Sequence, residues 1–125
     1  MSTADNNAEY YDLLAHRRMP LSVPAGEIVF QQGDQGDGMY LLREGSIALK
    51  DGDRLLDTVE APDLFGEMAL IQNEARSLTA VANTDAVLVE IPTRHFWLLV
   101  HETPYFAQLV MTVMADRLRR RGGST

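Results

Sequence analysis

The sequence predicts a mainly β fold, a roll of short antiparallel strands flanked by helices. Short apolar runs between residues 21 and 91 are separated by turn residues at close intervals, which is typical of rolls and sandwiches. A helical apolar stripe precedes this zone, and two helical segments follow it. With 125 residues, 46% of them hydrophobic, the chain suits a single domain, 1–125, with a substantial core.

Residues 1–20 form the predicted N-terminal helical lead. Tyr10, Leu13 and Leu14 recur at positions i, i+3 and i+4, so they form one apolar stripe on a helix over about residues 8–18. The two prolines that follow disfavour a helical conformation and are expected to start an extended segment.

Residues 21–91 form the predicted roll. The expected strands lie at residues 28–30, 39–42, 47–49, 55–59, 78–82 and 86–91. Glycine and aspartate clusters between them supply the turns. The frequent turns make each strand short, and a roll or a sandwich accommodates such strands.

Residues 64–71 interrupt the strand pattern. Gly66 permits close approach of the backbone, so the segment is expected to turn and then form one helical turn. Backbone N–H groups at the start of a helix attract anions. Arg76 follows Glu67 by nine positions, with no other basic residue near it along the chain.

Residues 93–121 form two predicted helices. Thr93 is expected to cap the first, which runs through Val100, and Pro104 begins the second. The apolar stripe of the second helix is expected to consist of Phe106, Leu109, Val110, Val113 and Leu118, with Met111 and Met114 beside it. Trp97 is expected to pack in the core rather than to stack on a ligand.

Composition excludes several kinds of site. The absence of cysteine excludes disulfides, thiolate metal sites and a cysteine nucleophile. The three histidines lack the spacing of a metal site, and no serine has a histidine nearby in the sequence. The chain carries a net charge of −7, with arginines gathered only at positions 117, 119, 120 and 121. Such an acidic body disfavours binding to nucleic acid or anionic membranes.

The pairing of Arg76 with Glu67 indicates a particular ligand chemistry. A guanidinium among apolar strands needs an anion, and it can contact phosphate oxygens through two parallel hydrogen bonds. A carboxylate would repel that phosphate, but it can accept a hydrogen bond from a sugar hydroxyl. The two side chains therefore suggest a ligand in which one phosphate lies close to one ribose hydroxyl.

The same residues resemble the phosphate-binding cassette of the cyclic nucleotide-binding domain family, which includes the catabolite activator protein and the regulatory subunit of cyclic-AMP-dependent protein kinase. The family pattern is roughly F-G-E-x-A-L followed, after a short loop, by R-[S/T/A]-A-[S/T]. This chain has Phe65–Leu70 and then Arg76–Thr79, a cassette within residues 64–79. The upstream segments Pro24–Ile28, Gly33–Asp37 and Gly45–Ile47 are similar to the family's early strands.

The resemblance implies a role for each matching position. Arg76 would bind the cyclic phosphate, with the Ser77 hydroxyl and the backbone N–H groups of Ser77 and Ala69 completing the cradle. Glu67 would accept the ribose 2′-OH beside the N–H of Gly66. The base pocket would comprise Leu49, Leu56, Val59, Arg120 and Arg121.

Three departures from the family pattern leave affinity and base preference open. Leu78 stands where alanine is usual, Ala75 replaces a common proline, and Glu60–Asp63 replaces a glycine-rich turn. None of them removes the arginine or the glutamate.

The polar N-terminus and the lack of a long apolar stretch indicate a cytoplasmic protein. The resemblance implies a Crp/Fnr-like sensor rather than an enzyme, with a cyclic nucleotide as ligand and no cofactor or metal. Ser77 after the arginine favours cyclic AMP over cyclic GMP, and cyclic dinucleotides are a smaller alternative. Ligand capture is expected to move the cassette helix and to let the C-terminal helix close over the base. Expected partners are a second copy, bound through the last helix, and an unidentified effector protein.

Two other interpretations remain open from the sequence. A ligand-free structural or dimerisation module could use Glu67 and Arg76 as an internal ion pair. A cupin-like metalloenzyme would also have a small β-barrel, but it would need clustered histidines, which the sequence lacks.

Overall fold

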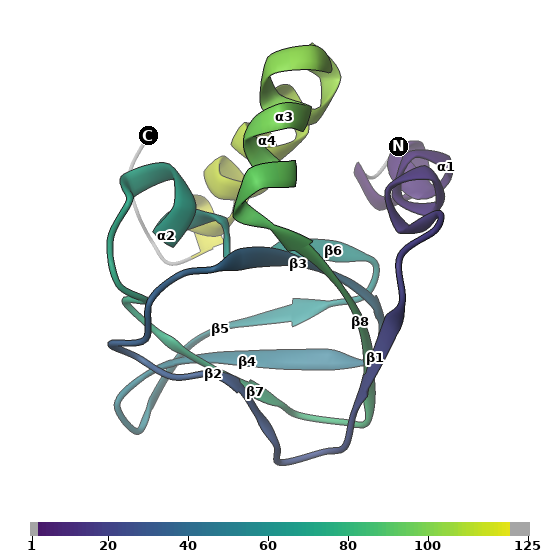
Figure 1. The fold of residues 1–125 in the computed structure, drawn as a ribbon. Helices are drawn as coiled ribbons and strands as arrows, with labels where there is room; N and C mark the ends of the chain where they lie inside the picture. Colours follow the sequence, from purple (N-terminus) through teal and green to yellow (C-terminus); the bar gives the residue numbers. More distant parts are fainter. Residues whose placement is uncertain (1–2, 121–125) are drawn as a thin grey trace.

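The computed structural model describes residues 3–120 as eight strands and four helices (Figure 1). The strands are β1 (Pro20–Val23), β2 (Ile28–Phe30), β3 (Gly38–Glu44), β4 (Ser46–Asp51), β5 (Arg54–Glu60), β6 (Asp63–Phe65), β7 (Thr79–Ala82) and β8 (Ala86–Pro92). The helices are α1 (Thr3–Ala15), α2 (Glu67–Gln72), α3 (Thr93–Glu102) and α4 (Pro104–Arg120).

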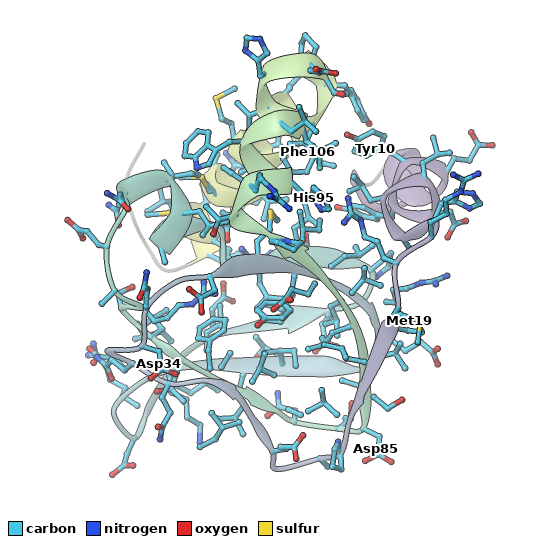
Figure 2. All side chains as sticks on the ribbon, viewed as in Figure 1. Tyr10, Met19, Asp34, Asp85, His95 and Phe106 are labelled. Atoms are coloured by element: carbon cyan, nitrogen blue, oxygen red, sulfur yellow. The ribbon has the colours of Figure 1, made fainter. Side chains whose placement is uncertain are left out.

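The strands form two four-stranded antiparallel sheets, which confirms the predicted mainly β roll with flanking helices. One sheet has the order β1-β8-β3-β6, and the other has the order β2-β7-β4-β5. Between the sheets lies a core of buried apolar side chains that includes Phe30, Leu42, Ile47, Val59 and Phe65. Figure 2 shows side chains filling this space.

A second core lies between the β1-β8-β3-β6 sheet and the four helices, each of which contributes at least one buried side chain. Strand side chains alternate between the faces of a sheet, so Leu41 and Val89 point to this core while Leu42 and Leu88 point between the sheets. Phe106, labelled on the helical side of the roll in Figure 2, is fully buried here. The sheet is therefore buried on both faces.

Helix α1 ends earlier than predicted, at Ala15 rather than near residue 18. Its predicted stripe is wrong in one position, because Leu13 is 70% exposed and Tyr11 is buried instead. A helical stripe of three residues can be drawn on either of two adjoining faces, and packing against α4 decides between them. Tyr10 and Leu14 do contact the helical core, as predicted.

The C-terminal helices differ from prediction in their details. Thr93 does not cap α3: it is the first helical residue, and no side-chain hydrogen bond caps the helix. Trp97 is 46% exposed, and Phe96 takes the core position beside it. In α4 four of the five predicted stripe residues are buried, but Leu118 is 51% exposed, because the buried stripe continues from Val113 to Arg117, four residues later, and not to Leu118.

Candidate functional site

A left-handed glycine positions the start of the cassette. Gly66 adopts a φ of +86° between β6 and α2, a conformation that side-chain-bearing residues rarely adopt. A Cβ placed there would lie 3.2 Å from Nη1 of Arg76 and 3.4 Å from the ring of Phe30. The turn therefore brings the backbone against the arginine, and α2 begins at the next residue, Glu67.

Arg76 is held inside the roll by backbone acceptors. Its side chain is only 5% exposed. Nη1 donates a hydrogen bond to the carbonyl of Gly66 at 2.6 Å, and Nη2 donates one to the carbonyl of Gly38 at 2.5 Å. The guanidinium carbon lies 4.1 Å from the centre of the Phe30 ring, within the range of a cation–π interaction. The arginine therefore neither points into bulk water nor is locked onto an internal acid.

The guanidinium retains unused capacity to bind an anion. Its Nε is buried and has no hydrogen-bond partner. Burial lowers the pKa of Arg76 from its ordinary value, while Tyr40 and the carboxylates of Asp37 and Glu67 act in the opposite direction. An arginine remains charged despite such a shift, so a buried cation with a free donor faces this region.

One cavity of about 140 Å³ collects the predicted phosphate and ribose residues. All five of them line it: Gly66, Glu67, Ala69, Arg76 and Ser77. The remaining walls are mainly apolar and come from Phe30, Leu49, Met68, Leu78, Met114, Arg117 and Leu118. The fold thus joins the turn before α2, the helix itself and the segment after it around a single space.

The predicted base pocket is only partly represented in the lining of this cavity. Of its five residues, only Leu49 lines the cavity. Val59 is fully buried between the sheets, because β5 turns that side chain inward, and Leu56 does not reach the cavity. Arg120 extends instead to Asp57, at 3.2 Å. Arg121 lies outside the described residues.

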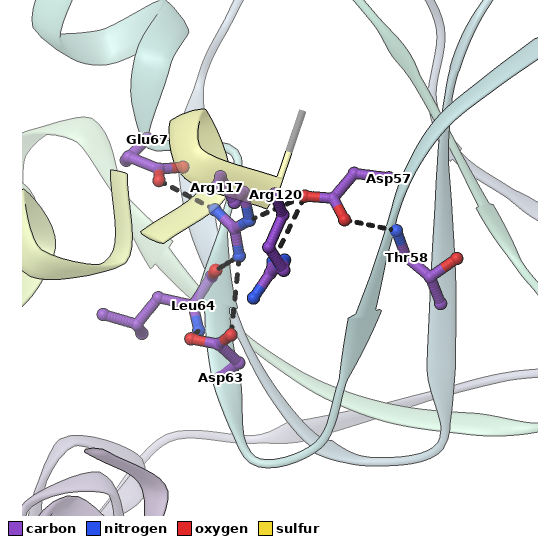
Figure 3. A network of polar contacts seen from close by, with 7 residues as sticks. All are labelled: Asp57, Thr58, Asp63, Leu64, Glu67, Arg117 and Arg120. Carbon is purple, nitrogen blue, oxygen red and sulfur yellow. Dashed lines mark hydrogen bonds and ion pairs between the residues drawn. The ribbon is translucent and has the colours of Figure 1, made fainter. Parts of the chain in front are cut away.

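Arg117 of α4 is the main functional candidate that sequence reasoning missed. Its side chain is 6% exposed, and Nη1 donates a hydrogen bond to Oε1 of Glu67 at 2.9 Å. It also donates a hydrogen bond to the carbonyl of Leu64 and lies 3.8 Å from Asp63 and 3.9 Å from Asp57 (Figure 3). Through this one side chain, α4 contacts β5, β6 and α2.

Several charged side chains lie close together around Arg117. Three carboxylates, those of Asp57, Asp63 and Glu67, surround its guanidinium, and Arg120 adds a second cation at Asp57. Burial raises the pKa of Asp63 above its ordinary value of 3.8, and the charge of Arg117 acts against that rise. Removing one partner of such a buried network is costly, because the remaining charges lose their compensation.

The sequence contained a weak signal for this network. Arg117 and Glu67 lie 50 positions apart, so no local spacing could pair them. The arginines near the C-terminus were the largest basic cluster available to the acidic turn around Asp63. Position 117 is also four residues after the buried Val113, which places it on the inward face of α4.

The part of the chain whose side chains the structure describes, residues 9–120, holds no group of three or more histidine or acidic side chains arranged to bind a metal ion. Nor does it contain a helix with the length and apolar character needed to cross a bilayer.

Comparison with known proteins agrees with this geometry. The family model described as "Cyclic nucleotide-binding domain" matches residues 20–103. The chain belongs to the cyclic nucleotide-binding domain family. The resemblance identified from the cassette residues is thereby confirmed. The match covers the roll, the cassette and α3.

Two relatives illustrate the range of proteins that contain such a domain. A cyclic nucleotide-gated potassium channel of Rhizobium etli is 35% identical over 104 residues, covering 83% of this chain and 28% of the channel. The cyclic AMP receptor protein of Thermus thermophilus is 33% identical over 101 residues, covering 77% of this chain and 47% of that protein. The chain therefore spans less than half the length of either relative.

The fold is also similar to that of a solved structure. The catabolite activator protein of Thermus thermophilus matches 90% of this chain with a TM-score of 0.75 and 32% identity, and the match covers 55% of that chain. The similarity includes the two-sheet roll and its flanking helices. These relatives are a channel and regulators, so the domain is of a regulatory type.

Proposed function

We propose that this domain binds a cyclic mononucleotide in the cavity between Arg76 and Glu67 and acts as a sensor. The observation that carries the proposal is the arrangement of Arg76. It is a buried cation with an unpartnered Nε, and it lines a cavity with a carboxylate and the start of a helix. A cyclic phosphodiester supplies one negative charge for the guanidinium, and the adjoining ribose supplies one hydroxyl for Glu67.

The residues divide the recognition between them. Arg76 binds the phosphate through its unpartnered Nε and the N–H groups that its bonds to the Gly66 and Gly38 carbonyls leave free. The Ser77 hydroxyl and the N–H groups near Ala69 add further donors. Glu67 accepts the ribose hydroxyl while Arg117 keeps the carboxylate oriented, since a carboxylate can accept several hydrogen bonds.

Cyclic AMP is the proposed preferred ligand. Ser77 follows the phosphate arginine where family members that prefer cyclic GMP often have threonine. The name of the Thermus thermophilus relative, cyclic AMP receptor protein, supports the same choice. Cyclic GMP is the alternative, and calorimetry of the native chain with each nucleotide distinguishes the two.

Signalling is proposed to occur through α4. Met114, Arg117 and Leu118 of this helix line the cavity, so the ligand contacts the helix directly. A ligand shifts an equilibrium only if it binds one arrangement better than another. Contact of one helix face with both the ligand and Glu67 supplies that difference, and a coupling of about 1–3 kcal/mol would be ordinary.

Calorimetry with Arg76→Ala tests the proposal. We expect the variant to bind cyclic AMP at least about 100-fold more weakly than the native chain, because the phosphate loses its charge-assisted hydrogen bonds. Arg43→Ala is the matched control, since Arg43 is exposed and does not line the cavity. Equal affinity of Arg76→Ala and the native chain would overturn the proposal.

Removing a buried arginine can also unfold the roll, so a second variant is needed. Ser77→Ala alters an exposed side chain in the cavity wall and leaves the Arg76 network intact. We expect it to weaken cyclic AMP binding about tenfold while the melting temperature without ligand stays unchanged.

The competing interpretation is a ligand-free dimerisation module with the same roll. The ion pair between Arg117 and Glu67 gives that carboxylate a structural partner within the chain. This contact favours the ligand-free module. A melting scan with each nucleotide separates the two functions. When the free nucleotide concentration is 100 times the dissociation constant, a sensor gains about 2.7 kcal/mol of stability, whereas a ligand-free module gains none.

A further inference from the structure

A second hollow, of about 450 Å³, lies against α2 but apart from Arg76 and Glu67. Three segments enclose it: the 33–36 loop, the second half of α2 with the turn after it, and the start of α3. Ala69 lines both this hollow and the nucleotide cavity. The hollow is therefore a separate space that shares one helix with the candidate nucleotide site.

Two large apolar side chains are exposed at this hollow. Trp97 of α3 is 46% exposed and Ile71 of α2 is 39% exposed, although each has buried neighbours on its own helix. Phe96 contacts the indole in an edge-to-face arrangement, with ring centres 4.9 Å apart. Apolar groups gathered around a concavity, with polar residues at the rim, are typical of interaction sites.

The charge of the hollow favours a cation. Among its lining residues Glu74 is the one ionisable side chain, and Gln35 and Asn73 add amide oxygens. The chain as a whole carries −7. An anionic partner would therefore meet repulsion both at the hollow and at long range, whereas a cation would be attracted.

A guanidinium group can interact both with the aromatic side chain of Trp97 and with the carboxylate of Glu74, which line the hollow. It is planar, so it can stack on an indole, and its donors can contact a carboxylate through two parallel hydrogen bonds. An ammonium group cannot stack in this way. Arg94, exposed next to Thr93, places one positive charge near the rim and so favours a single arginine over a run of basic residues.

We propose that this hollow is a docking site for an arginine side chain of a partner protein, stacked on Trp97 and paired with Glu74. A side chain within a peptide is favoured over free arginine, because the lining of the hollow offers no cation to pair with the α-carboxylate of the free amino acid. The proposal does not require a bound nucleotide, so it can fail without affecting the proposed function.

The hollow is mechanically connected to the phosphate site. The N–H of Gly33 donates a hydrogen bond to the carbonyl of Arg76 at 2.8 Å, and the N–H of Arg76 donates one to the carbonyl of Asp34 at 2.7 Å. Asp34 is labelled on this loop in Figure 2. A partner that occupies the hollow would thus contact the loop that anchors the backbone of Arg76.

Fluorescence of Trp97 tests the proposal directly, because it is the only tryptophan in the chain. The probe is a five-residue peptide with a central arginine, blocked at both ends and titrated into the nucleotide-free protein. We expect a saturable change in emission, and at least about tenfold weaker binding of the same peptide with citrulline, which lacks the positive charge. No saturable response at millimolar peptide, or equal binding of the two peptides, would overturn the proposal.

A matched pair of variants locates the site. Glu74→Gln should weaken arginine-peptide binding about tenfold by removing the carboxylate partner. Glu102→Gln removes an equally exposed carboxylate at the end of α3, away from the hollow, and should leave the affinity unchanged. Melting curves verify that both variants are folded, and equal weakening by both would place the peptide elsewhere.

Discussion

Arg117 joins the C-terminal helix to the cassette through a single side chain. The guanidinium lies within 3.9 Å of three carboxylates and also binds the Leu64 carbonyl. It is buried, so solvent does not screen these interactions as it would screen a surface pair. The residue therefore affects both the stability of the fold and the orientation of Glu67.

Arg117→Met is expected to lower the free energy of unfolding by about 3–5 kcal/mol, because it leaves buried carboxylates without their cation. Urea denaturation measures the change. Arg119→Met is the control, since Arg119 is 57% exposed and pairs only with Asp116 on its own helix. A loss as small as that of the control, within about 0.5 kcal/mol, would show that the network contributes little.

Asp63 makes the stability of the fold depend on pH. Burial raises the pKa of its carboxyl in the folded chain, so the folded state retains a proton that the unfolded state has released. Ionisation of Asp63 therefore costs stability, and the cost appears as the pH rises above about 4.

Replacement by asparagine removes that titration. We expect the stability of Asp63→Asn relative to the native chain to increase as the pH rises above about 4, measured by urea denaturation at several pH values. Asp53→Asn, at an exposed turn, should show no such trend. A difference for Asp63→Asn that is constant, or that falls with pH, would contradict the assignment.

The segment from β6 through α2 depends on the conformation of Gly66. Alanine there would combine the strain of a φ of +86° with a contact of 3.2 Å to Nη1 of Arg76. We expect Gly66→Ala to lose more than the ~1–2 kcal/mol that a left-handed conformation alone costs an L-residue. Thermal unfolding of Gly66→Ala, compared with that of Gly26→Ala, checks this expectation.

Gly26→Ala isolates the conformational cost. Gly26 has a similar φ of +90°, but nothing lies within 4 Å of its hypothetical Cβ. The difference between the two variants therefore measures the crowding at the cassette. Equal losses would mean that the arginine moves aside freely, and the site would then be less rigid than the contacts indicate.

Elements defined by local patterns were predictable from the sequence, and long-range contacts were not. The glycine turn and the single helical turn at Gly66 follow from local conformational preferences, and the structure has them. The place of Val59, between the sheets and away from the cavity lining, could not be predicted, because the faces of β5 depend on its register with β4, which pairs Val59 with Ile47. A two-residue apolar pattern does not define that register.

At the scale of the whole molecule, the unpredicted features arise where distant segments meet. Arg117 reaches Glu67 across 50 positions, and Trp97 forms a wall with a loop some sixty residues earlier in the chain. The family resemblance supplied the phosphate and ribose residues, because these lie close together in one cassette. Contacts from α4 come from a separate part of the chain, so each one depends on how that helix packs.

The exposed side of α4 suggests a contact with a second copy of the chain. Met111 is 62% exposed and Leu118, at the cavity, is 51% exposed, and their seven-residue separation places them on one side of the helix. We expect light scattering to give a mass twice the 13.9 kDa of the chain. Met111→Glu would place an unpaired charge in this contact, so we expect the dimer to dissociate and the mass to fall to that of one chain.

Leu13→Glu provides the control for that experiment. Leu13 is 70% exposed on α1, so a charge there should leave the dimer intact. A monomeric native chain, or a dimer that persists in Met111→Glu, would exclude this face of α4 as the contact.

The burial of the β1-β8-β3-β6 sheet on both faces limits how the domain can respond to a ligand. Neighbouring residues of β3 belong to opposite cores, so a shift of this strand would disturb the packing on both of its sides at once. We therefore expect the sheet to stay fixed and the movement to occur in the helices that pack against it. Spectroscopic labels placed on β3 would serve as fixed reference points for measuring how far α2 and α4 travel.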